Sequence, residues 1–230
     1  MGHNHSNTEN TCPFDLRFAG PDSGEQVLSC DRLLRLLPGK RATYEGRWGV
    51  QPVIAKLFYR RVRAASRLKR ECRKLRELSR RGIPVPAVLW TGRTGAAHYL
   101  LVMEKIGEGA SLEGVCVDGR NAATEEASVT ALVELVAACH AAGVLQADLH
   151  LGNFVWHKGK LHVVDASRIK FYRQSLGEGR SLRNLGLLLA QLPCLSAEKE
   201  AQLVTDYFRC RGWKATQERL RAAGTSKRRA

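Results

Sequence analysis

The chain has 230 residues, 44% of them hydrophobic and 26% charged, a composition that excludes a wholly disordered protein and is typical of one or two folded domains. Lysine and arginine number 37 against 22 acidic residues, and the net charge of +15 predicts an anionic partner: nucleic acid, a membrane surface or a phosphorylated substrate. The seven cysteines form no C-x-x-C pair, and no apolar run approaches the ~20 residues of a membrane span, so we expect a reduced, cytoplasmic protein without a zinc motif.

The first part of the chain is predicted to form a twisted antiparallel sheet. Residues 1–27 are expected to be a flexible segment, and short strands follow over residues 31–37, 42–48 and 52–59. The turn between the first two of these strands contains Gly39 and lies where a loop covering nucleotide phosphates would lie. Because this turn has only one glycine, it is a weak nucleotide-binding signal.

The third predicted strand carries one lysine, Lys56, in the apolar run 53–58. A buried ammonium group costs desolvation free energy unless an anion pairs with it, so Lys56 requires a carboxylate or a phosphate. The alternative is an edge-strand lysine that points into water. A helix is predicted over residues 61–81, where apolar residues recur at three- and four-residue steps. Glu71 lies on the flank of its apolar stripe and Glu77 on the opposite side, so Glu71 is the predicted partner.

The outward face of this helix is almost entirely basic. It carries Arg60, Arg61, Arg63, Arg67, Lys69, Arg70, Arg73, Lys74, Arg76, Arg80 and Arg81. A charged face is often simply solvated, but a face of one sign repels itself unless it contacts an anion. The pattern therefore favours a functional anionic contact over plain solvation.

The middle of the chain is predicted to complete the sheet and to begin a helical part. Strands are expected over residues 85–89 and 98–103. The connection 103–109 bears two glycines and is predicted to be a hinge, with Glu104 as a candidate contact for the adenine of a nucleotide. A core helix follows over residues 125–141, because apolar residues occupy most of its faces.

Three polar residues in the next part of the chain have the spacing of a phosphoryl-transfer site. Asp148 precedes Asn153 by five residues, and a hairpin over residues 154–164 ends at Asp165. Phosphoryl transfer requires positioning and charge neutralisation, and the oxygen ligands of Asn153 and Asp165 suit magnesium. Asp148 could accept a hydrogen bond from an attacking hydroxyl group. The alternative is an ordinary turn with Asp165 at a strand end.

The last part of the chain is predicted to be helical. A basic stretch follows Asp165 as far as residue 173, and residues 181–185 lead into an apolar helix that Pro193 ends. An amphipathic helix is expected over residues 196–210, with Ser196 as its N-cap. A further helix is expected over residues 216–223. Only a basic tail follows.

In this order and at these separations, Lys56, Glu71, Asp148, Asn153 and Asp165 make the chain resemble the protein-kinase-like superfamily from about residue 28 to residue 192. Within it, the chain is similar to the bacterial lipopolysaccharide kinase family, which phosphorylates Kdo or heptose of the inner core. The segments that carry this similarity are 68–71, 82–86, 140–144, 147–150 and 164–168. The resemblance implies an α+β fold with two lobes, a small antiparallel-sheet N-lobe over residues 28–105 and a mainly helical C-lobe over residues 106–224, followed by a basic tail over residues 225–230.

The resemblance also implies roles for individual residues, with ATP and Mg²⁺ as the cofactors. Lys56 would bind the α- and β-phosphates, Glu71 would orient Lys56, and Asp148 would be the catalytic base. Magnesium would be held by Asn153 and Asp165, and the nucleotide would also contact Gly39 and Glu104.

The chain departs from the kinase pattern in several places. Gln146 replaces the histidine usual two residues before the catalytic aspartate, and His150 replaces a lysine that many protein kinases carry after it. Asn184 replaces an aspartate of the family, which questions how the catalytic loop is anchored. No Ala-Pro-Glu segment follows Asp165, so the platform that protein kinases use for a protein substrate is missing.

Three functional hypotheses follow. The first is a sugar kinase that acts on lipopolysaccharide core, or another anionic acceptor, at the inner face of the cytoplasmic membrane, with the basic helix in peripheral contact with anionic lipid. The second is an atypical protein kinase or ATPase of an RNA-linked complex, such as the Rio-like kinases; nucleic acid is the less favoured partner. The third is a pseudokinase that acts as a binding module. The sequence predicts neither the acceptor hydroxyl nor the oligomeric state.

Overall fold

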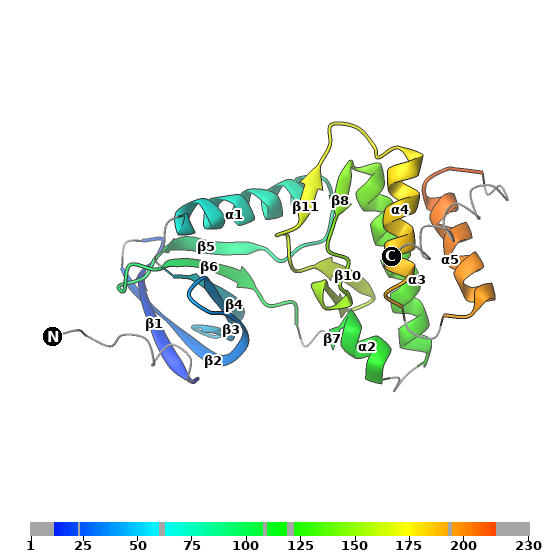
Figure 1. Ribbon diagram of the computed structural model, residues 1–230. Coiled ribbons are helices and arrows are strands. Elements are labelled where there is room, and N and C mark those ends of the chain that lie inside the picture. Colours follow the sequence, from blue (N-terminus) through cyan, green and yellow to red (C-terminus); the bar gives the residue numbers. More distant parts are fainter. Residues whose placement is uncertain are drawn as a thin grey trace. The chain divides into compact units, whose positions relative to one another are not determined.

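The computed structural model describes residues 12–22, 24–59, 63–107, 110–118, 122–192 and 195–214. Contacts along the chain divide it into two compact units (Figure 1). The first comprises residues 1–76 and 86–107, and the second comprises residues 77–85 and 108–230. A sheet dominates the first unit and helices dominate the second, which confirms the predicted α+β fold class.

The first unit contains a six-stranded sheet in the order β1-β2-β3-β4-β6-β5, in which every neighbouring pair is antiparallel. Its strands are β1 (Phe14–Ala19), β2 (Glu25–Leu37), β3 (Arg41–Trp48), β4 (Gln51–Phe58), β5 (Val88–Arg93) and β6 (Tyr99–Glu104). Five of these strands were predicted from apolar patterns and turn signals; β1 was not, and the strand expected over residues 85–89 begins three residues later, as β5. Strand β4 is central, because β3 and β6 pair with its two edges.

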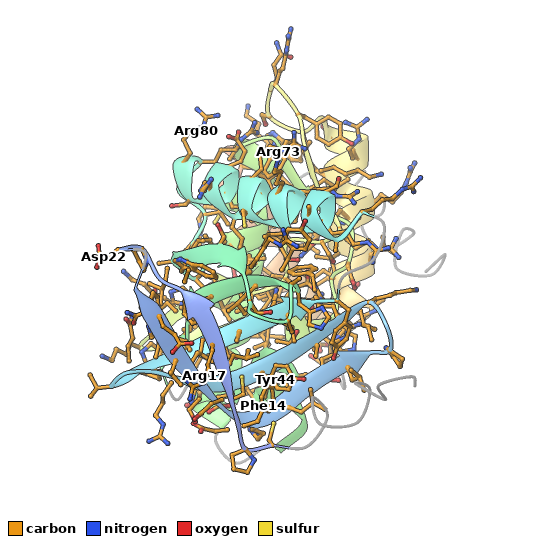
Figure 2. All side chains as sticks on the ribbon, turned by 90° about the vertical axis from the view of Figure 1, so that its left-hand side faces the viewer. Phe14, Arg17, Asp22, Tyr44, Arg73 and Arg80 are labelled. Carbon is orange, nitrogen blue, oxygen red and sulfur yellow. The ribbon has the colours of Figure 1, made fainter. Side chains whose placement is uncertain are left out.

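The sheet begins earlier than the sequence indicates. The expected flexible segment over residues 1–27 contains β1, in which Leu16 and Phe18 point into the core while their neighbours stay exposed. Phe14 packs edge-to-face on Tyr44 of β3, with 5.1 Å between the ring centroids, and Figure 2 shows these two side chains together. The flexible-segment prediction is therefore wrong for residues 14–19 and for residues 25–27, where β2 begins, because strand pairing and burial of alternate apolar side chains outweigh the polar composition of the surrounding sequence.

Helix α1 (Ala64–Arg80) follows the sheet, and its residues 64–76 belong to the first unit. The predicted apolar stripe is buried; it comprises Ala64, Leu68, Cys72, Leu75 and Leu78. Gly82 follows the helix with a positive φ of 75°, and Ile83 N–H donates to the Leu78 carbonyl at 3.0 Å in the manner of a C-terminal cap. The predicted helix start at Arg61 lies outside the described residues.

The second unit is built around α3 (Ala122–Ala141), which packs against α4 (Glu178–Leu189) and α5 (Ala197–Cys210), as Figure 1 shows. The remaining elements are short: α2 (Leu112–Asp118), the three-stranded sheet β10-β9-β7 (Lys160–Val163, Phe154–His157 and Ala110–Ser111), and the pair β8 (Val144–Gln146) with β11 (Ile169–Phe171). The core helix, the hairpin and the Ser196 N-cap, which accepts from Lys199 N–H, confirm the predictions.

The sequence missed α2, β7, β8 and β11, because elements of two to seven residues carry too few periods for a pattern to emerge. The predicted helix over residues 216–223 and the tail lie outside the described residues. Among the helices that the structure describes, none combines the length and the apolar character needed to cross a membrane.

Candidate active site

A buried group of three charged side chains lies in the first unit. Lys56 of β4 donates from Nζ to Oε1 of Glu71 on α1 at 2.5 Å, and Arg41 of β3 donates from Nη1 to Oε2 of the same carboxylate at 3.1 Å. Lys56 and Glu71 are only 5% and 6% exposed. The predicted pair is confirmed, and the alternative of a water-exposed lysine is wrong, because β4 lies in the middle of the sheet. Glu77, as predicted, is not the partner; it binds Arg80 and Arg81.

The electrostatics of this group favour an added anion. Two cations share one carboxylate in a site that excludes most water, so the trio of Arg41, Lys56 and Glu71 carries a net positive charge where charge is poorly solvated. The sequence missed Arg41. The register of β3 on β4 would have indicated it: Thr43 lies opposite Lys56, and Arg41 lies two residues before Thr43, on the same face of the sheet.

The two other predicted nucleotide contacts of this unit are Gly39 and Glu104. Gly39 occupies the turn between β2 and β3 with φ of 60°, a left-handed conformation that favours glycine, and Lys40 N–H closes the turn on the Leu37 carbonyl at 2.9 Å. Glu104 ends β6, and both its amide and its carboxylate bind the backbone of Ala87. Nucleotide binding by Gly39 and Glu104 stays a prediction.

The loop that carries Asp148 lies in the second unit, between β8 and the 3₁₀ helix η1 (Leu151–Asn153). The side chain of Asp148 is exposed. Asn153 donates from Nδ2 to the Asp148 carbonyl at 3.1 Å, which turns the amide oxygen of Asn153 away from the loop backbone. This bond fixes the orientation of the Asn153 amide, and magnesium binding by its oxygen stays a prediction.

Asp165 follows β10 at the end of the predicted hairpin. Its Oδ1 accepts from Ser167 N–H at 2.8 Å, and its backbone carbonyl accepts from Nε2 of Gln146 at 3.1 Å. Oε1 of Gln146 accepts from Asp148 N–H at 3.4 Å. Gln146 therefore ties the segment of Asp148 to that of Asp165, a positioning role that replaces the usual histidine.

Asn184 of α4 also supports this loop. Its Nδ2 donates to the backbone carbonyl of Gln146 at 3.0 Å, and the side chain is buried. The loop thus remains anchored even though an amide replaces the aspartate of the family. His140 lies behind Asn184 with no exposed surface, and burial lowers the pKa of its imidazole to about 4.

His150 and Glu113 form an exposed pair beside the loop. His150 Nδ1 accepts from Gly152 N–H at 3.1 Å, and its Nε2 lies 3.8 Å from Oε1 of Glu113 on α2. The sequence missed Glu113, because α2 was not predicted and nothing local in the sequence connects the two residues.

The side chains present fit magnesium better than a metal that prefers sulfur or nitrogen. Across the described residues, no three His, Cys, Asp or Glu side chains converge on a metal position. Magnesium in phosphoryl-transfer enzymes takes few protein ligands and completes its octahedron with phosphate oxygens and water. Asn153 and Asp165 offer oxygen atoms of that kind.

The first unit is an antiparallel sheet with a buried Lys56–Glu71 pair. The helical unit carries Asp148, Asn153 and Asp165 in the order found in kinases. Together these features define a protein-kinase-like fold. The chain is similar in fold to a solved structure described as "Crystal structure of BubR1 kinase domain", with a TM-score of 0.51 and 18% sequence identity over 70% of this chain and 51% of that chain. This chain therefore spans about half of that one, and the low identity supports the fold alone.

A sequence comparison identifies the family. The model of the lipopolysaccharide kinase (Kdo/WaaP) family matches residues 41–186, more than half of the chain. The protein belongs to this lipopolysaccharide kinase family, which confirms the resemblance inferred from its motifs. A comparison with curated protein sequences finds no match.

Proposed function

We propose that the protein is an ATP-dependent kinase that phosphorylates a sugar hydroxyl group, of Kdo or heptose, in the inner core of lipopolysaccharide. The observation that supports this function best is the buried Lys56–Glu71 pair with Arg41, in a chain of the lipopolysaccharide kinase family. A protein that only needed a stable sheet would gain little from three buried charges, since a buried ion pair is often less stabilising than apolar residues of similar size. A phosphate-binding role accounts for them.

Lys56 is the residue proposed to bind the α- and β-phosphates. Glu71 fixes the position of its ammonium group through the 2.5 Å contact, and Arg41 holds the second oxygen of Glu71 so that the carboxylate cannot rotate. Arg41 is therefore a positioning residue for Lys56. When bound, magnesium-ATP supplies a γ-phosphoryl group whose charge is partly neutralised.

Asn153 and Asp165 would hold the magnesium ion through their side-chain oxygens. Asp148 would accept the proton of the acceptor hydroxyl and aim its oxygen at the γ-phosphorus. The sugar oxygen forms a new bond to phosphorus as the bond to the β-phosphate oxygen breaks, so that the products are a phosphosugar and ADP. The exposed side chain of Asp148 is accessible to a bulky acceptor.

The acceptor and the location are proposed from charge. Arg63, just before α1, and Lys69, Arg70 and Arg73 on α1 are exposed, and Figure 2 shows Arg73 on the side of the helix turned away from the sheet. An anionic lipid surface or a core sugar that already carries negative charge would relieve the repulsion among them. We therefore place the protein at the inner face of the cytoplasmic membrane, in peripheral contact.

The test is a competition with labelled ATP. Purified protein is offered lipopolysaccharide core oligosaccharide and RNA together, with the Asp165→Asn variant as the inactive control. Label on the sugar, absent with the variant, supports the proposed function. Tight binding of RNA with no transfer to any carbohydrate would instead favour the atypical kinase of an RNA-linked complex, and nucleotide binding without any turnover would favour a pseudokinase.

A further inference from the structure

Behind the Asp148 loop, polar side chains from three helices form a continuous chain of hydrogen bonds. Arg211 Nη1 donates to the Tyr207 hydroxyl at 3.0 Å, this hydroxyl lies 2.7 Å from His140 Nδ1, and His140 Nε2 lies 2.9 Å from Asn184 Oδ1. Asn184 Nδ2 completes the chain on the Gln146 carbonyl at 3.0 Å. Tyr207 and His140 have no exposed surface, so water cannot replace these bonds.

The direction of every bond in this chain is determined. The Gln146 carbonyl can only accept, so the amide nitrogen of Asn184 faces it and the amide oxygen faces His140. His140 must then donate from Nε2 and, as a neutral ring, accept at Nδ1 from the Tyr207 hydroxyl. The Tyr207 oxygen accepts in turn from Arg211, which can only donate. The chain therefore runs one way, from a guanidinium group to the catalytic loop.

Arg211 is itself fixed by several contacts at the end of α5. Its Nη1 also donates to the Ser181 hydroxyl of α4 at 3.1 Å, and its Nη2 donates to the Ser175 hydroxyl at 2.8 Å and to the Leu176 carbonyl at 3.0 Å. The ring of Trp213 lies 4.4 Å from the guanidinium carbon. A guanidinium group held this way gives the chain a fixed first donor.

We propose that Tyr207 and Arg211, both in or next to α5, are positioning residues for phosphoryl transfer, because they set the orientation of Asn184 and through it the backbone of Gln146, two residues before Asp148. This inference rests on the proposed kinase activity of the Asp148 loop. It assigns α5 a part in catalysis although this helix contributes no residue to the catalytic motif. A misplacement of about 1 Å at a catalytic group can cost on the order of 10²-fold in rate, so a small rotation of Asn184 would be measurable.

The same chain of hydrogen bonds explains why residue 184 is an asparagine. An aspartate there could not donate to the Gln146 carbonyl, and its charge would draw a proton onto His140. A protonated His140 could no longer accept from Tyr207, so the chain would break at two bonds. The neutral state of His140, which burial maintains through a pKa of about 4, and the amide of Asn184 therefore require each other.

The experiment compares Tyr207→Phe and Asn184→Asp with a matched control, Val204→Ala, which removes buried apolar atoms from α5 without touching the chain. Turnover, KM for ATP and thermal stability are measured for each protein. We expect Tyr207→Phe to lower kcat roughly 10- to 10²-fold with little change in KM, and Val204→Ala to lose stability while kcat is retained. If Tyr207→Phe and Val204→Ala both lose kcat in proportion to their lost stability, the positioning role is overturned.

Two further measurements separate this inference from the proposed function. The imidazole pKa of His140, followed by NMR, should rise in Asn184→Asp and stay unchanged in Val204→Ala. Amide chemical shifts over residues 146–153 should change in Tyr207→Phe and Asn184→Asp but not in the control. If the wild-type protein transfers no phosphate, the proposed function fails, but the chemical shifts still test the chain of hydrogen bonds. Unchanged shifts in both variants would contradict the positioning role. Arg211→Lys, which keeps the charge but not the planar donors, replaces Tyr207→Phe if that variant does not fold.

Discussion

At the residue scale, the chemistry proposed for the loop depends on two carboxylates with different tasks. Asp148 would act on the acceptor hydroxyl, while Asp165 would bind the metal. Asp148→Asn and Asp165→Asn should each lower turnover by at least ~10²-fold, equivalent to ~2.7 kcal/mol of activation free energy, because each removes one charge without changing side-chain size. Steady-state kinetics measure this, with circular dichroism as the control for folding. Near-normal turnover by a folded Asp165→Asn protein would contradict the metal-binding assignment.

The buried trio of Arg41, Lys56 and Glu71 gives a second prediction. Lys56→Met should abolish most transfer while leaving thermal stability unchanged or higher. A hydrophobic residue of similar size then replaces a buried ammonium group, and Arg41 still neutralises the carboxylate of Glu71. Glu71→Ala should lower both stability and turnover, since it leaves two buried cations facing each other. Differential scanning fluorimetry and kinetics distinguish the two variants. Equal stability losses in both would mean that the charges do not interact as the structure indicates.

His140 gives a pH dependence. Its pKa is lowered from 6.5 to about 4 in the folded protein, chiefly by burial, so between these values the unfolded chain binds more protons and stability falls as the pH falls. The full shift corresponds to about 3 kcal/mol, of which about 2 kcal/mol should be lost between pH 7 and pH 5. Urea unfolding at the two pH values measures this. His140→Gln, which has no titrating ring, should show a much smaller loss, and an equal loss would assign the effect to other groups.

The sequence was most informative for residues whose chemistry is unusual in their surroundings. Lys56 in an apolar strand demanded an anion, and helical periodicity selected Glu71 over Glu77, as the structure confirms. Arg41 escaped detection because its approach to Glu71 depends on strand register, which the sequence does not determine by itself. Asn184 could be flagged only as a departure from the family. Its two bonds join α3 and the loop, contacts between segments far apart in sequence.

At the element scale, long periodic segments were predictable and short ones were not. The helices α1, α3 and α5 and the hairpin β9–β10 each present at least two periods of their pattern or a strong turn signal. Strands β8 and β11 have three residues each and exist because they pair with each other across residues 147–168. Strand β1 likewise depends on contacts with distant segments, since its aromatic side chains pack against β3 and β5.

The basic face of α1, together with Arg63 just before the helix, gives the prediction that belongs to this scale. Reversing Arg63, Arg67 and Arg70 to Glu should weaken binding to anionic vesicles or core oligosaccharide by at least ~10²-fold at low salt, since each basic residue near such a surface contributes about 1 kcal/mol. The effect should fade at high salt as the Debye length shortens. Vesicle co-sedimentation measures the binding, and ATP turnover should change less.

A matched control tests whether position matters as well as charge. Reversing Arg35, Lys158 and Lys160, which are exposed and lie outside α1, changes the net charge by the same amount. Binding by this control should fall much less than binding by the α1 variant. Equal losses would show that the protein binds anions through its overall charge, and α1 would then be only a solvated face.

At the scale of the whole molecule, the fold class and the family were predictable because the diagnostic residues are ordered along the chain. A kinase motif set is a property of sequence order and spacing, and both the fold similarity and the family match agree with it. The acceptor is less predictable for a physical reason. Binding residues are often carried by loops and short elements, where side-chain placement is set by contacts between distant segments, and a helix as short as α2 was itself not predicted.

Nucleotide binding should be visible in the stability of the whole protein, because a ligand that binds only the folded state raises the free energy of unfolding. At a concentration of 100 times its dissociation constant, magnesium-ATP should add about 2.7 kcal/mol, which for a protein of this size corresponds to a rise in Tm of roughly 5–10 °C. The rise should shrink when EDTA removes magnesium, and it should be nearly absent in Lys56→Met. Differential scanning calorimetry at several ATP concentrations measures it, and an identical rise in wild type and Lys56→Met would show that the nucleotide binds elsewhere. A normal rise without phosphoryl transfer to any acceptor would retain the nucleotide site but point to a pseudokinase.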